Sequence, residues 1–240
     1  IVDETANIAL AAKRIVFGKL LNAGQTCVAP DYIYCDREIK DELIRQIQKQ
    51  IRKQFGSTPL NNKNYGKIIN EKHFTRICNL IDPSKVVCGG DNNPGALQIA
   101  PTVMDNVTFG DAVMQEEIFG PVLPVLAYDS LDEAIEKVNS MAHPLALYIF
   151  TSDKEAAEKV TSRCGFGGGC VNDTIIHLAT SEMGFGGFGE SGMGSYHGKD
   201  GFHTFSHYKS IVDKKTWLDL PMRYQPYRKI YEKLLRKFLK

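Results

Sequence analysis

Helix-like and strand-like stretches alternate along most of this sequence, and this alternation restricts the fold more than any other feature. In residues 38–54, for example, isoleucine or leucine recurs every four positions, which is typical of a helix with one buried face. Strands that alternate with such helices indicate an α/β domain with a largely parallel sheet. We therefore predict strands at residues 28–35, 85–88, 99–104, 122–128, 145–150 and 169–173, with further helices at 3–22, 70–81 and directly after residues 130 and 152.

Three of these helices begin at side chains that can cap a helix. Asp3 is a candidate cap for the first helix because its carboxylate can accept a hydrogen bond from a free backbone amide. Ser130 and Ser152 are each followed by a glutamate three residues later, which is the pattern of a capping box.

Residues 22–30, Asn-Ala-Gly-Gln-Thr-Cys-Val-Ala-Pro, join the first predicted helix to the first predicted strand. Gly24 permits the left-handed backbone that often ends a helix. Cys27 follows in a loop where backbone amides remain available for a substrate oxygen. Because a cysteine thiolate is a strong nucleophile, Cys27 is a candidate catalytic residue. From this motif alone, a buried cysteine with a packing role is an equal alternative.

The overall composition narrows the class of protein. The net charge of +1 gives no indication of a nucleic-acid partner, and the sequence has no apolar run of transmembrane length and no secretory signal. The six cysteines form no CxxC pair, so we expect a reduced, cytoplasmic chain without a disulfide framework or a metal site. The sequence begins at Ile1 and reads as a fragment or processed piece of a longer protein.

Two loops contain residues that suit a cofactor. Residues 184–189 fit the pattern G-x-G-x-x-G, but more loop follows them instead of a helix, so we reject a dinucleotide site and expect a loop that shapes a pocket. In residues 115–121, Gln-Glu-Glu-Ile-Phe-Gly-Pro, a carboxylate could bind a ribose and Phe119 could pack on a flat ring. Composition alone favours a solvated acidic turn with Phe119 in the core.

Taken together, these motifs resemble the aldehyde dehydrogenase superfamily. The resemblance rests first on Gly-Gln-Thr-Cys at 24–27 and Glu-Glu-Ile-Phe-Gly-Pro at 116–121, in that order. Residues 29–32, 144–148, 171–174, 191–199 and 205–207 resemble the class 3 branch, and the similarity covers nearly all of residues 1–215.

The resemblance implies an oxidation that depends on NAD or NADP. Cys27 would add to an aldehyde, and the thiohemiacetal would pass a hydride to the nicotinamide and leave a thioester, which water opens to a carboxylic acid. The amide of Cys27 would help to hold the oxyanion. Glu117 matches the residue that binds the nicotinamide ribose, and Phe119 matches the aromatic residue beside the nicotinamide.

The same resemblance places essential parts before Ile1. These are the Rossmann-like cofactor domain, the glutamate that acts as general base and the asparagine that completes the oxyanion hole. We therefore expect residues 1–203 to be the catalytic domain of a longer enzyme, inactive or nearly so by itself. Residues 204–221 would provide a strand, at 204–212, and a connector for a homodimer.

Residues 222–240 form a predicted basic amphipathic helix opened by Pro226. The helix could lie on an anionic membrane surface, or its apolar face could dock on the protein near the mouth of the active site. Docking is favoured because one short helix binds membranes weakly. The expected apolar side contains Tyr227, Ile230, Tyr231, Leu234 and Phe238.

Two other functions remain open from the sequence. Cys27 could pair with His177, His197, His203 or His207 as a thiol hydrolase, although the context of the sequence supports no particular pair. The chain could also be a folded binding domain without activity. Dependence on NAD(P) separates a dehydrogenase from a hydrolase.

Overall fold

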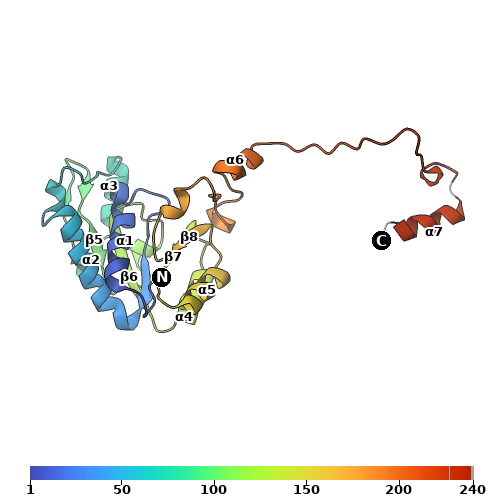
Figure 1. The fold of residues 1–240 in the computed structure, drawn as a ribbon. Coiled ribbons are helices and arrows are strands. Elements are labelled where there is room, and N and C mark those ends of the chain that lie inside the picture. Colours follow the sequence, from blue (N-terminus) through green and yellow to red (C-terminus); the bar gives the residue numbers. More distant parts are fainter. Residues whose placement is uncertain (227, 239–240) are drawn as a thin grey trace. The chain divides into compact units, whose positions relative to one another are not determined.

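The computed structural model describes residues 1–226 and 228–238, and the chain divides into two compact units, Ile1–Phe205 and Ser206–Lys240 (Figure 1). The first unit is built on two sheets. A four-stranded sheet has the order β1-β6-β5-β2, and β7 pairs with β8 in a two-stranded sheet. All of these pairs are parallel except β2–β5, which confirms the expected α/β fold with a largely parallel sheet. The strands are β1 (Ile33–Asp36), β2 (Val86–Cys88), β5 (Thr102–Met104), β6 (Val122–Tyr128), β7 (Ala146–Ile149) and β8 (Gly168–Val171), with a small hairpin of β3 (Asn92–Asn93) and β4 (Gln98–Ile99).

Helices cover both faces of the larger sheet because side chains alternate along each strand. Ile33 and Cys35 pack in one buried cluster with α1 (Ile8–Leu20) and α2 (Lys40–Phe55). Tyr34, between them, packs in a second cluster with α3 (Glu71–Asn79). A third cluster joins α4 (Leu131–Asn139) and α5 (Lys154–Arg163) to β7, and the three elements lie together in Figure 1. The predicted apolar face is buried at Leu43, Ile47 and Ile51 on α2 and at Ile39, which directly precedes α2.

Residues 1–3 connect the two sheets. Val2 forms parallel bridges with Cys35 on one side and with Phe150 on the other. The amide of Val2 donates to the carbonyl of Tyr34 at 3.0 Å, and the amide of Asp3 donates to the carbonyl of Phe150 at 2.9 Å. This short segment therefore runs as a strand between β1 and β7.

The helix caps differ from two of the three expectations. Asn7, and not Asp3, caps α1, and its side chain accepts from the amide of Leu10 at 3.1 Å. Asp3 instead accepts from the hydroxyl groups of Thr5 and Thr151. Both Asp3 and Asn7 have suitable side chains, but Asn7 directly precedes the first helical turn.

Of the two predicted serine caps, one is confirmed and the other is not. Ser130 caps α4 as predicted and accepts from the amide of Glu133 at 3.2 Å. At α5, Asp153 takes the place predicted for Ser152 and accepts from the amide of Glu155 at 2.8 Å. The capping motif was therefore placed one residue too early at α5.

Three predicted strands needed correction. The strand predicted at 28–35 begins only at Ile33, since residues 26–29 turn around Cys27 and Pro30 has no amide to donate. The strand predicted at 99–104 is split at Pro101 between β4 and β5. The strand predicted at 204–212 is not formed in the single chain. Thr204 ends α6 (Gly198–Thr204), and residues 205–212 carry no strand in the structure as described, because a strand requires a neighbour to pair with.

In the second unit, the predicted C-terminal helix is present as α7 (Lys229–Phe238). It begins after Pro226, and the parts of the prediction that concern Tyr227 and residues 239–240 lie outside the described residues. Ile230, Leu234 and Leu235 are exposed on it. Among the helices described, none combines the length and the apolar character needed to cross a bilayer.

Candidate active site

Cys27 lies in the wall of a cavity of about 560 Å³. It is exposed, and the amide of Ala29 donates to the carbonyl of Thr26 at 3.0 Å to close a turn around it. The hydroxyl of Tyr148 also holds this turn, because it donates a hydrogen bond to the carbonyl of Val28 at 2.6 Å. Among the described residues, the amide of Cys27 donates to no other group. That amide is therefore available to a ligand atom at the cysteine.

The other five cysteines differ from Cys27 in their environment. Each is buried or partly buried, and burial raises the pKa of each thiol, for Cys35 to about 12. A thiol with a raised pKa is a poor source of thiolate. These observations indicate packing roles for the other five cysteines and leave Cys27 as the candidate nucleophile.

A close backbone contact joins the turn before Cys27 to the loop that carries Glu117. Gly24 has a φ of +78°, and a Cβ atom placed on it would lie 2.2 Å from the carbonyl oxygen of Gly120. Real Cβ contacts are never this short, so the contact requires a glycine. The motifs at 24–27 and 116–121, far apart in sequence, therefore meet backbone to backbone.

The side chain of Gln25 fixes the same turn from another direction. Its amide nitrogen donates to the carbonyl of Lys67 at 2.9 Å, and its oxygen accepts from the amide of Ile69 at 3.0 Å. The Gln-Thr-Cys turn is thus fixed to residues 67–69 as well as to Gly120.

Glu117 lines the cavity that contains Cys27, whereas Phe119 is not among the lining residues. Phe119 is 40% exposed and has a φ of +48°, so the alternative that placed it in the core is wrong. Its neighbour Ile118 is the buried residue, at 0% exposure. Burial raises the pKa of the Glu117 carboxyl, and the negative charge of Asp31 adds to this rise.

Two charged side chains hold this loop at the Ile118 peptide. The amide of Ile118 donates to the carboxylate of Asp31 at 3.1 Å. The guanidinium of Arg76, on α3, donates to the carbonyl of Ile118 at 2.6 Å and to that of Glu117 at 3.2 Å. The backbone beside Glu117 is therefore bound on both sides.

Lys19 lies beneath this loop with only 1% of its surface exposed. Its ammonium donates to the carbonyl of Asp31 at 3.3 Å and lies 4.0 Å from the Asp31 carboxylate. Burial lowers the pKa of Lys19 to about 8, against the opposing effect of Asp31 and Glu117. Burial also raises the pKa of Asp31, although that carboxylate is accessible from the cavity.

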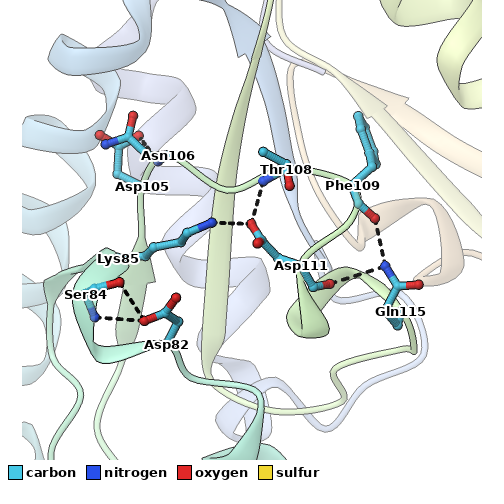
Figure 2. A network of polar contacts seen from close by, with 9 residues as sticks. All are labelled: Asp82, Ser84, Lys85, Asp105, Asn106, Thr108, Phe109, Asp111 and Gln115. Atoms are coloured by element: carbon cyan, nitrogen blue, oxygen red, sulfur yellow. Dashed lines mark hydrogen bonds and ion pairs between the residues drawn. The ribbon is translucent and has the colours of Figure 1, made fainter.

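A second polar network fixes the chain just before Glu116 (Figure 2). Lys85 donates to the carboxylate of Asp111 at 2.6 Å, and the same carboxylate accepts from the amide of Thr108 at 2.7 Å. Gln115 donates to the carbonyl of Phe109 at 2.7 Å and to that of Asp111 at 3.3 Å. In Figure 2, Asp111 and Gln115 bond within residues 108–115, whereas Lys85 reaches Asp111 from a separate segment.

Two of the histidines considered as partners of Cys27 have other contacts. The imidazole of His177 lies 3.7 Å from the sulfur of Cys170, and the ring of His197 stacks on Phe185. The glycine-rich loop at 184–189 leads to a short 3-10 helix (Gly189–Ser191), and Glu190 and Ser191 line the cavity as a pocket-shaping loop should. Among the described residues, no group of three or more His, Cys, Asp or Glu could hold a metal ion.

The sequence did not identify Lys19 or Arg76 as site residues. Asp31 lies within residues 29–32, which resemble the class 3 branch, but the sequence assigned it no role of its own. One signal was present for Lys19, which lies four residues after Ile15 on the buried face of α1. A lysine on an apolar face is unusual unless it has a partner.

Comparison with known proteins shows similarity to aldehyde dehydrogenases over most of the chain. The model of the aldehyde dehydrogenase family matches residues 1–211. The chain is 48% identical to a 4,4'-diaponeurosporen-aldehyde dehydrogenase of Staphylococcus aureus, over 95% of this chain and 50% of that protein. It is 45% identical to the dimeric NADP-preferring aldehyde dehydrogenase of Mus musculus, over 88% of this chain and 47% of that protein.

A solved structure gives the same result. The substrate-bound state of Staphylococcus aureus AldH superimposes with a TM-score of 0.93 and 46% identity, and the match covers 100% of this chain and 52% of that one. The chain spans about half the length of each of these three proteins.

The contact between Gly24 and Gly120 predicts a large loss of stability for Gly24→Ala. Gly56 is a matched control because it also has a positive φ, of +88°, but no atom lies within 4 Å of a Cβ placed on it. Gly56→Ala should lower the free energy of unfolding by about 1 kcal/mol through backbone strain. Gly24→Ala should cost at least about 2 kcal/mol more, because the loop at Gly120 must move. Urea unfolding measures both, and equal losses would contradict the contact.

The burial of Lys19 predicts that stability rises with pH. The folded chain releases the Lys19 proton at about pH 8 and the unfolded chain near 10.5, so the unfolded state holds more protons between these values. The burial cost is present in full below pH 8 and disappears as the pH rises toward 10.5. Relative to Lys19→Met, the unchanged chain should gain on the order of 3 kcal/mol across this window.

The measurement is urea unfolding of both chains at several pH values. Lys13→Met is the control, since Lys13 is exposed on the same helix and its removal should give no such trend. A difference between the unchanged chain and Lys19→Met that is constant across the window would show that Lys19 is not buried as a titrating group.

Proposed function

This chain belongs to the aldehyde dehydrogenase family, and we propose that it is the catalytic part of an enzyme that oxidises an aldehyde to a carboxylic acid with NAD or NADP. The observation that supports this most is the position of Cys27. It is exposed in the wall of a cavity that Glu117 also lines, on a turn whose cysteine amide is available.

The proposed chemistry begins with the thiolate of Cys27. It forms a bond to the carbonyl carbon of the aldehyde, and the carbonyl oxygen gains a negative charge that the amide of Cys27 can stabilise. The thiohemiacetal then loses a hydride and becomes a thioester, and NAD or NADP, when bound, would supply the acceptor for that hydride. Water then adds to the thioester, the acid leaves and the thiol of Cys27 is restored. The aldehyde is oxidised, the cofactor is reduced, and one water is consumed.

Glu117, which lines the cavity, and Phe119, which is exposed two residues further along the same loop, suit the nicotinamide end of the cofactor. The carboxylate of Glu117 can accept hydrogen bonds from the two ribose hydroxyls, and the ring of Phe119 is exposed and could pack on a planar group. We assign these two roles to Glu117 and Phe119 because the resemblance of residues 116–121 to the family implies them. Asp31 and Arg76 hold the Ile118 peptide between the two residues. The general base and the rest of the cofactor site would come from outside residues 1–240.

The thiol-hydrolase alternative has less support, because His177 and His197 have other partners. An inert binding domain remains the second candidate for the chain alone. If an aldehyde analogue blocks the labelling of the Cys27 thiol, that result would argue against an inert domain.

We also propose a homodimer through residues 204–212, which could form a strand by pairing with a second subunit. The relative from Mus musculus is named as dimeric. Light scattering that finds a monomer at micromolar concentration would contradict this for the 240-residue chain.

For α7, we propose that its apolar side docks on protein. An anionic membrane surface is the alternative, because this segment has only one acid, Glu232, and several basic residues: Arg228, Lys229, Lys233, Arg236 and Lys237. Equal pelleting with anionic vesicles, with and without residues 222–240, would exclude the membrane.

The proposed role of Cys27 predicts that Cys27→Ser lowers kcat of the full-length enzyme by about a thousandfold or more, because a serine hydroxyl is a much weaker nucleophile without a dedicated base. Cys78→Ser is the control and should leave kcat unchanged, since Cys78 lies on α3 and does not line the cavity. The assay follows reduction of NAD(P) with an aldehyde. Substantial activity of Cys27→Ser would refute the mechanism, and appreciable activity of the 240-residue chain alone would show that this half is sufficient.

The same assay tests Glu117. Glu117→Gln should raise the KM for the cofactor by about tenfold, because a neutral amide binds ribose hydroxyls less strongly than a carboxylate does. Glu116→Gln is the control, because Glu116 lies 3.5 Å from Arg76 and does not line the cavity. If Glu117→Gln leaves the KM for the cofactor unchanged, the proposed role of Glu117 in binding the cofactor is wrong.

A further inference from the structure

The side chain of Tyr148, on β7, has a hydroxyl group that its position in the sheet does not require. Its neighbours in the strand, Leu147 and Ile149, are apolar, and the side chain of Tyr148 is itself only 7% exposed. A phenylalanine would satisfy packing at such a position. The hydroxyl instead donates to the carbonyl of Val28 at 2.6 Å, which is short for a bond between a hydroxyl and a carbonyl. Because β7 pairs with β8, the sheet fixes the backbone from which this hydroxyl reaches the turn of Cys27.

The bond to Val28 is the first of a chain of hydrogen bonds that leads to the amide of Cys27. The carbonyl of Val28 shares a peptide group with the amide of Ala29, and that amide donates to the carbonyl of Thr26 at 3.0 Å. The carbonyl of Thr26 shares a peptide group with the amide of Cys27, which donates to no other group among the described residues. Hydrogen bonds in such a chain polarise one another, so the last donor is stronger than it would be alone. That last donor is the amide proposed to hold the oxyanion.

The hydroxyl of Tyr148 keeps the proton that a donor needs. Burial raises the pKa of Tyr148 well above its usual value, and negative charge at Cys170 or Cys27 adds to this rise. A charge that develops at Cys27 therefore makes loss of the phenol proton harder. The hydroxyl remains a donor while the sulfur reacts.

A strained turn contacts the same hydroxyl from the other side. Ile175 has a φ of +68° and a ψ of −41°, and the amide of Ile176 donates to the carbonyl of Thr174 at 2.7 Å, which makes a γ-turn. This form of the turn is strained, above all at a β-branched residue, and persists only where its surroundings hold it. A hydrogen bond from the backbone of Ile175 opposes the rise in the pKa of Tyr148, as a donor to the phenol oxygen does. The chain of hydrogen bonds thus extends beyond Tyr148 into the peptide of Thr174 and Ile175.

We propose that Tyr148 is a positioning residue whose hydroxyl strengthens the amide of Cys27 as a donor to the oxyanion, through the peptide groups of residues 28–29 and 26–27. This inference rests on the proposed function. The hydroxyl acts through the turn and not on the aldehyde itself. Its effect appears when the carbonyl oxygen of the aldehyde gains charge, and it has no such effect on a reaction of Cys27 that forms no oxyanion.

The test compares Tyr148→Phe with the unchanged full-length enzyme in two reactions of Cys27. Aldehyde oxidation forms an oxyanion, whereas alkylation by iodoacetamide forms a bond from sulfur to carbon, releases iodide and forms none. The oxidation is followed as the rate of the first turnover of NAD(P) reduction, so that release of product does not mask the chemistry.

Tyr148→Phe should lower the first-turnover rate by about two- to eightfold, because an oxyanion donor accounts for about 10²–10³ in rate and each bond in a chain changes the next by about 10–30%. The KM for the cofactor should not change. The rate of alkylation of Cys27 should stay within about twofold of that of the unchanged enzyme, because the amide of Cys27 takes no part in that reaction.

Tyr128→Phe is the matched control. Tyr128 is also buried, and its hydroxyl also donates to a backbone carbonyl, that of Val2 at 3.1 Å. It is the last residue of β6, which runs parallel to β1, whereas Cys27 precedes the start of β1. The two residues therefore lie toward opposite ends of the sheet. Tyr128→Phe should lower stability in urea and leave the first-turnover rate unchanged.

A second replacement keeps the shape of the side chain, so it does not depend on whether Tyr148→Phe folds. With 3,5-difluorotyrosine at position 148, the phenol is more acidic and is a stronger donor. The first-turnover rate should then rise by about twofold, with the rate of alkylation unchanged.

Two results would overturn the proposal. One is a first-turnover rate that neither replacement of Tyr148 changes. The other is a parallel fall in the first-turnover rate and the rate of alkylation, because Tyr148 would then only hold Cys27 in place. Failure of the proposed function gives a different result, since Cys27→Ser would then retain the oxidation whatever the replacements at position 148 do.

Discussion

The structure of the site depends on the contact in which Gly24 meets the carbonyl of Gly120. This contact fixes the distance between the turn of Cys27 and the loop of Glu117 through backbone atoms, which have little freedom to adjust. Side chains then secure each partner separately, Gln25 on one side and Arg76 on the other. The proposed nucleophile and the proposed cofactor-facing loop, held in this way, keep their relative positions without a bound ligand, which is what positional catalysis requires.

Beneath this contact, the protein tolerates a buried positive charge. Lys19 is almost fully buried, and its charge is offset by Asp31 and Glu117. The pKa of the lysine is lowered and the pKa values of the two acids are raised, in each case mainly by burial. Breaking one member of such a group usually costs more than the group contributes, because the remaining charges stay buried. We interpret the cluster as a means of specifying the position of the loop rather than as a source of stability.

The sequence predicted what depends on local patterns. The spacing of Ile39, Leu43, Ile47 and Ile51 identified the buried face of α2, and serine at residue 130 identified the start of α4. Features that depend on distant partners could not be read locally. Ile118 is buried and Phe119 exposed because Asp31 and Arg76 hold the peptide between them, and residues 204–212 lack a strand because pairing needs a neighbour. Cys27 and Glu117 were identified by family resemblance, whereas their common cavity follows from the tertiary fold.

The exposure of Cys27 has a chemical consequence. Of the six cysteines in this chain, the other five are at least partly buried, and burial raises the pKa of their thiols. A soft electrophile or a peroxide that reaches the protein will therefore react first at Cys27, and oxidation beyond the sulfenic acid is not readily reversed. The accessibility that the proposed reaction requires of this sulfur also makes Cys27 the cysteine most vulnerable to oxidative damage.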